Sequence, residues 1–187
     1  QAGRWYRLYL RAFPDAEPTP HMNFMYAELL SSAERHDLAA AQYERSAYSY
    51  GAHAKAAEAG YAALLAYDKH ESSLRGEPRR RWHRNNITSA LRFAGTFPAH
   101  EQAQPVRLRA AQQLYALEDY AAAVAAARPL VTQGQASHAL QLSAWTVIAH
   151  GEFDQDRYAA AEAAYREVLA RTPRDAEEAS HLEVLGV

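Results

Sequence analysis

The chain has 187 residues, of which 49% are apolar; its net charge is −2 and it contains no cysteine. That apolar share can bury a core, which excludes wholesale disorder, and the missing thiols exclude disulfides and thiolate metal sites. The near-neutral charge gives no global attraction to nucleic acid or to anionic membranes. Alanine, the best helix former, is abundant while valine and isoleucine are scarce, so the composition indicates an all-α fold.

The first predicted element is a helix that already runs by Trp5 and ends near Phe13-Pro14. It has no partner helix before it, so residues 1–18 are predicted to form a leading half-repeat. The chain begins without Met, and we expect a fragment or a processed chain. No run of 18 or more apolar residues occurs, so no membrane span is predicted.

A helix pair is predicted over residues 20–53, with apolar or small residues at helical spacing and Gly51 at the closing corner. The residues that define its two buried faces are Ala27, Leu30, His36, Ala39, Tyr43 and Ser46.

The next predicted pair, residues 54–100, is longer than its neighbours. We expect a long first helix, a polar connection from Ser72 to Pro78, and a second helix that ends at Phe97-Pro98. Insertions within repeats map to loops on one face, often the binding face.

Two further pairs are predicted over residues 101–135 and 136–174, followed by a trailing helix over 175–187. The last pair is the clearest. Its first helix is followed by a looser segment, Gly151 to Gln155, that predicts a turn, and Pro173 ends its second helix. The apolar faces of this pair contain Trp145, Ile148 and Ala149, then Tyr158, Ala161, Tyr165 and Val168.

The residues of that last pair, at this spacing, resemble the tetratricopeptide repeat, whose unit is about 34 residues long. The resemblance implies a right-handed superhelical solenoid of antiparallel helix pairs over residues 1–187, as a single domain with about four pairs plus a leading and a trailing helix. Small residues such as Ala149 and Ala161 would lie where helices come close. Glu152 departs from the pattern, because an aromatic residue is usual there, and Phe153 is expected to take that role.

The resemblance also implies that the first helix of each pair lines a concave groove. The predicted function is a scaffold, within a larger bacterial protein, that binds a peptide or partner protein by aromatic anchors and side-chain hydrogen bonds. A second copy of the chain is one candidate partner, and a structural spacer in a longer solenoid is the alternative function. The predicted groove residues are Phe24, Glu28, Ser31, Glu58, Ala62, Arg109, Gln112, Tyr115 and His150.

One basic stretch, Arg79, Arg80, Arg81 and Arg84, surrounds Trp82. Either it docks an acidic peptide, a phosphate or a nucleic acid, or it is a solvated helix start whose Trp82 packs inward. The second interpretation is favoured, since blocks of like charge are commonly solvated surface.

Nothing in the sequence predicts an enzyme, a cofactor or a metal site. No two histidines have the i, i+4 spacing of helical metal ligands, and neither a GxSxG motif nor a phosphate-binding glycine loop occurs. The alanine and arginine content is typical of a GC-rich bacterial genome. The segment from Ala39 to Glu44, followed by Tyr48 and Tyr50, is similar to repeats of bacterial envelope proteins, so we expect a periplasmic rather than a cytoplasmic location.

Overall fold

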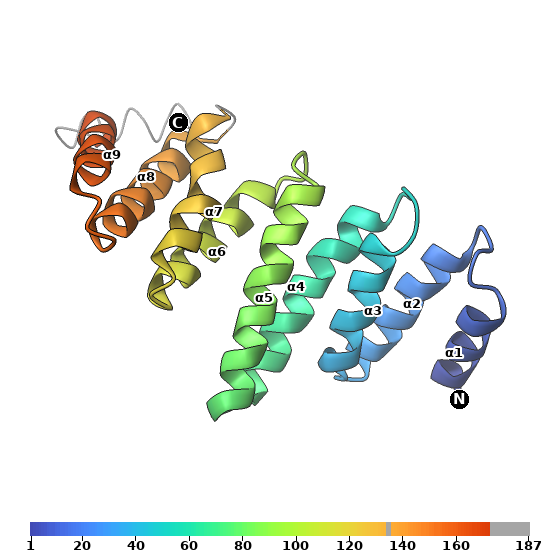
Figure 1. Ribbon diagram of the computed structural model, residues 1–187. Helices are drawn as coiled ribbons and strands as arrows, with labels where there is room; N and C mark the ends of the chain where they lie inside the picture. Colours follow the sequence, from blue (N-terminus) through green and yellow to red (C-terminus); the bar gives the residue numbers. More distant parts are fainter. Residues whose placement is uncertain (134–135, 173–187) are drawn as a thin grey trace. The chain divides into compact units, whose positions relative to one another are not determined.

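The computed structural model describes residues 1–133 and 136–172, and all regular structure in these residues is α-helical (Figure 1). The all-α prediction is therefore confirmed, while the predicted trailing helix over 175–187 lies outside the described residues. The chain divides into two compact units, residues 1–100 and 101–187. This boundary coincides with the predicted limit between the repeats 54–100 and 101–135.

Each helix of the first unit packs against the next one along the chain. The predicted polar loop from Ser72 to Pro78 is wrong, because only Leu74 and Arg75 separate the two long helices. The extra residues of this pair are helical: its helices have 18 and 21 residues, against 14 and 13 in the pair before it. The helices are α1 (Ala2–Ala12), α2 (Thr19–Ser32), α3 (His36–Tyr48), α4 (Ala56–Ser73) and α5 (Gly76–Thr96).

The core of the first unit is built from alanines and a few aromatic rings. Ala27, Ala39 and Ala63 are fully buried, and Phe24 and Tyr43 pack beside them. Small side chains let the helix backbones come close, so burial is spread over many alanines rather than over a few large residues.

The second unit contains α6 (Ala103–Ala116), α7 (Tyr120–Thr132), α8 (His138–Phe153) and α9 (Tyr158–Arg171). Here the turn predicted from Gly151 to Gln155 begins too early, because α8 continues through Gly151 to Phe153, whereas Asp154 and Gln155 do lie in a turn. A Cβ atom at Gly151 would lie 2.7 Å from Val124 Cγ2 of α7, so the glycine permits a close approach of these two helices. Besides contacting α7, α8 also contacts α6.

Three turns between paired helices share one backbone geometry. In each, a single non-glycine residue has a positive φ, and the next N–H donates to a carbonyl five residues earlier, as in a Schellman motif. The following helix begins two residues after the positive-φ residue. These residues are Glu34 (φ 58°), Glu118 (φ 61°) and Asp156 (φ 59°), and the hydrogen bonds are Arg35 to Leu30, Asp119 to Leu114 and Arg157 to Glu152.

The same register places buried alanines on both helices of these pairs. Seven residues before each positive-φ residue, and five residues after it, the chain has an alanine that is at most 2% exposed. This agrees with the prediction that small residues such as Ala149 and Ala161 lie where helices come close. The alanines are Ala27, Ala111 and Ala149 before the turns, and Ala39, Ala123 and Ala161 after them.

Candidate binding surfaces

In the first unit, four of the predicted groove residues surround Tyr43 of α3. The Tyr43 hydroxyl donates to Glu28 Oε1 over 2.5 Å, and its ring lies 5.8 Å from that of Phe24. Burial raises the pKa of Tyr43, and the hydrogen bond and negative charge of Glu28 raise it further. Ser31 also lies beside this phenol, and Glu58 adds a smaller electrostatic effect on it. Three predicted groove residues, Glu28 and Ser31 of α2 and Glu58 of α4, thus lie around a single phenol.

Phe24 itself is only 6% exposed, so the prediction that it offers an open aromatic anchor is wrong. Its ring is covered by Lys55, whose ammonium lies 5.5 Å from the ring centroid and 2.5 Å from Glu58 Oε2. Ala62 is half-buried against the same core. The exposed part of this surface is therefore acidic and polar rather than aromatic.

In the second unit, predicted groove residues from α6 and α8 meet directly. The Tyr115 ring lies 6.0 Å from the ring of His150, which in turn lies 5.7 Å from the ring of Tyr165 on α9. The Tyr115 hydroxyl donates to Asp154 Oδ2 over 2.6 Å, and this hydrogen bond is the main reason that the pKa of Tyr115 rises to about 12. Gln112 is exposed one turn before Tyr115.

Arg109, one turn further back on α6, is exposed as well. The turn register relates three predicted residues that come from different helix pairs. Glu28, Gln112 and His150 each lie six residues before a positive-φ residue, and all three are exposed.

Sequence reasoning missed two neighbours of Tyr115, because one lies in a turn and the other at the start of a second helix. Tyr120 at the start of α7 lies 5.3 Å from Tyr115, and Asp154 accepts its hydrogen bond. Phe153 is 52% exposed and Tyr158 is 58% exposed, with their rings 5.6 Å apart. Phe153 therefore does not take the packing role expected for it.

That packing position is held instead by Glu152, which is 4% exposed. Arg128 of α7 donates to its carboxylate over 3.0 Å, and Arg157 does so over 3.4 Å. A buried carboxylate needs such partners, because desolvation of an unpaired charge is costly.

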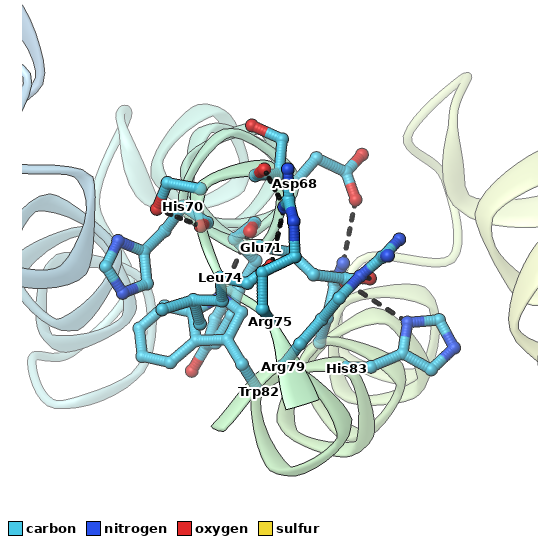
Figure 2. A network of polar contacts seen from close by, with 12 residues as sticks. Asp68, His70, Glu71, Leu74, Arg75, Arg79, Trp82 and His83 are labelled. Carbon is cyan, nitrogen blue, oxygen red and sulfur yellow. Dashed lines mark hydrogen bonds and ion pairs between the residues drawn. The ribbon is translucent and has the colours of Figure 1, made fainter. Parts of the chain in front are cut away.

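Trp82 of the basic stretch packs inward at the α4–α5 end (Figure 2). Its indole N–H donates to the Tyr67 carbonyl over 3.0 Å, and its ring lies 4.4 Å from His70. The side chain is thus a packing residue between the two long helices, as the favoured interpretation of this stretch expects.

The arginines around Trp82 differ in their partners. Arg79 lies 3.6 Å from Glu71, which also contacts His83 Nδ1 at 3.1 Å (Figure 2). Arg80 pairs with Glu77 at 2.5 Å on the first turn of α5. Arg81 and Arg84 are exposed, and no acidic side chain in the described part of the chain forms an ion pair with either. Two of the four predicted basic residues are thus neutralised locally.

Among the residues that the structure describes, no group of three or more His, Asp or Glu side chains is placed to hold a metal ion. Within the same residues, no helix combines the length and the apolar character that crossing a bilayer requires. No model of a known protein family matches the chain, and a search of curated proteins finds no sequence similar to it.

Proposed function

We propose that this chain is a tetratricopeptide-like interaction scaffold that binds a segment of a partner protein on the first helices of its pairs. The observation that carries the proposal is the surface formed by Tyr115 and His150. These side chains come from two helices and 35 positions apart in sequence, yet their rings contact each other while His150 remains exposed. Tyrosine and histidine rings of this kind supply contact area and hydrogen bonds at low entropic cost.

The repeated turn geometry also supports a repeat protein. Three helix pairs share one turn motif and one register of buried alanines, although their other residues differ. In such proteins each pair needs its neighbours to bury its apolar face, and the stacked pairs present extended binding surfaces.

The test is site-specific photo-crosslinking from Gln112, which is exposed on α6 beside Tyr115. A photoreactive residue at this position is expected to capture a partner protein in the host, and Tyr115→Ala or His150→Ala is expected to abolish the capture. The matched control is the same photoreactive residue at Ala125, which is exposed on α7. The proposal is wrong if Gln112 captures nothing, or if both positions give the same products regardless of the alanine variants. A spacer segment would give the first of these results.

A further inference from the structure

The turn end of the second unit carries exposed rings together with unpaired carboxylates. Phe153 and Tyr158 are more than half exposed and form an edge-to-face pair. No lysine or arginine of the described residues forms an ion pair with Glu118, Asp154 or Asp156. We call this surface the aromatic–acidic edge; it consists of Tyr115, Tyr120, Phe153 and Tyr158 with Glu118, Asp119, Asp154 and Asp156.

Specific contacts join the two turns that carry these residues. Tyr115 of α6 reaches Asp154 beyond the end of α8, and Tyr120 packs on Tyr115. Tyr158 in turn donates to Asp156 over 2.6 Å. Asp154 and Asp156 accept these hydrogen bonds from neutral phenols, so both carboxylates keep their negative charge available to a cation.

The first unit carries a surface of opposite charge where α4 and α5 meet. Helices of 18 and 21 residues are about 27 and 31 Å long, against about 20 Å for α2 and α3. The α4–α5 pair is therefore longer than the pair before it. This region contains six cationic residues and three acidic ones, Asp68, Glu71 and Glu77. We call this end the arginine tip; its cationic residues are Lys69, Arg75, Arg79, Arg80, Arg81 and Arg84.

Guanidinium groups bind carboxylates through paired N–H donors and also stack on aromatic faces. The first unit contains examples of both a cation stacked on an aromatic ring and a cation paired with a carboxylate. The Arg92 guanidinium lies 3.8 Å from the ring centroid of Tyr48, and Lys55 combines a contact to the Phe24 ring with an ion pair to Glu58. At the tip, Arg81 and Arg84 are one helical turn apart, exposed, and not engaged in such contacts.

We propose that the arginine tip of one copy docks on the aromatic–acidic edge of a second copy. The two surfaces differ, so the contact is head-to-tail and leaves one tip and one edge free for further copies. The inference rests on the proposed function, since it names the chain itself as a partner for the surface around Tyr115. The chain has a net charge of only −2, so separated patches of opposite sign can attract without overall repulsion between copies.

The test is sedimentation velocity of the whole chain over a wide concentration range, at about 20 mM and about 500 mM salt. We expect the mean mass to rise with concentration at low salt and to fall back to that of the monomer at high salt. Arg81→Glu with Arg84→Glu is expected to weaken association at least tenfold, and so is Asp154→Lys with Asp156→Lys. Circular dichroism of each variant shows whether it is folded.

A mixture of the two charge-reversed variants gives the sharpest result. Each variant retains the surface that the other lacks, and the two reversed surfaces are again of opposite charge, so the mixture is expected to associate, with the two variants alternating at one-to-one stoichiometry. Phe153→Ala with Tyr158→Ala removes the rings without changing the charge and is expected to weaken association as well. The control, Arg4→Glu with Arg11→Glu on α1, makes the same charge change elsewhere and should leave association unchanged.

The inference is overturned if the wild-type chain remains monomeric at low salt and high concentration, or if association survives the reversal at Arg81 and Arg84. Cross-linking from Gln112 separates this failure from that of the proposed function. A monomeric chain that still captures another protein at Gln112 retains the proposed function and loses only the self-association. A monomeric chain that captures nothing loses both.

Discussion

The contact between Gly151 of α8 and Val124 of α7 permits a quantitative test of the helix packing. Replacing a helical glycine by alanine normally stabilises a helix by about 1 kcal/mol. At Gly151, however, the new methyl group would lie 2.7 Å from Val124 Cγ2 and 3.4 Å from the Tyr120 carbonyl oxygen. Val124 is buried and β-branched, so it cannot rotate away cheaply. Overpacking of this kind costs about 1–3 kcal/mol, so Gly151→Ala is expected to destabilise the protein by about 1 kcal/mol net.

Urea denaturation followed by circular dichroism measures this change. The control is Gly3→Ala in α1, where the nearest atoms would be 3.6 Å away and the substitution should stabilise by a few tenths to about 1 kcal/mol. Val124→Ala alone is expected to cost about 2 kcal/mol. Combined with Gly151→Ala it should cost less than the sum, with a favourable coupling of about 1–2 kcal/mol. If Gly151→Ala stabilises the protein as Gly3→Ala does, the two helices do not approach as the structure shows.

Three further predictions concern other features. Glu118→Gly relieves a left-handed backbone and is expected to raise the free energy of unfolding by about 1 kcal/mol, whereas Glu118→Ala should change it little; equal effects in urea denaturation would contradict the assigned turn. Burial raises the pKa of Tyr48 to about 12, so the stabilisation of its neutral phenol is present below about pH 10 and lost as pH rises toward 12. Tyr48→Phe should therefore lose less stability than wild type between pH 8 and pH 11.5, and an equal loss would refute this. Finally, Arg128→Ala with Arg157→Ala leaves the buried Glu152 carboxylate without its ion pairs and should lower the free energy of unfolding by about 3 kcal/mol. Glu152→Gln should lower it by only about 1 kcal/mol. If urea denaturation shows a larger loss for Glu152→Gln than for the double arginine variant, the ion pairs are not arranged as described.

Most helix positions could be predicted from the sequence, because their limits depend on local signals. Phe13-Pro14 and Phe97-Pro98 follow the ends of α1 and α5, as expected from the restrictions that proline places on its neighbours. The α4–α5 connection was harder to predict, since the polar residues from Ser72 to Pro78 are as compatible with helix ends as with a loop. The turn predicted from Gly151 began too early for a different reason. The small size of this glycine permits a contact between α8 and α7, and no local sequence pattern indicates such a contact.

The candidate binding surface could be predicted only in part. Helical register placed Tyr115 and His150 in the same predicted set of groove residues, and the structure brings their rings to 6.0 Å from each other. Register alone does not say which aromatic side chain turns inward, and Phe24 proved to be buried under Lys55. Nor does it find a residue such as Asp154, whose importance comes from a tertiary hydrogen bond.

The position four residues before the positive-φ residue shows why the likeness between these three helix pairs is hard to detect by sequence. It is occupied by Leu30 and Leu114 in two pairs and by Glu152 in a third. The leucines are half-buried apolar side chains, whereas the buried Glu152 carboxylate is held by two arginines from adjacent segments. The same turn geometry is thus compatible with opposite chemistries, provided that the surrounding side chains compensate. In a comparison of residue types, a charged residue stands where the other two pairs have leucine. The backbone hydrogen bond of the turn and the buried alanines on either side are the same in all three pairs. These three helix pairs therefore share their turns and their buried alanines, and they differ where neighbouring side chains can satisfy the residue that lies between them.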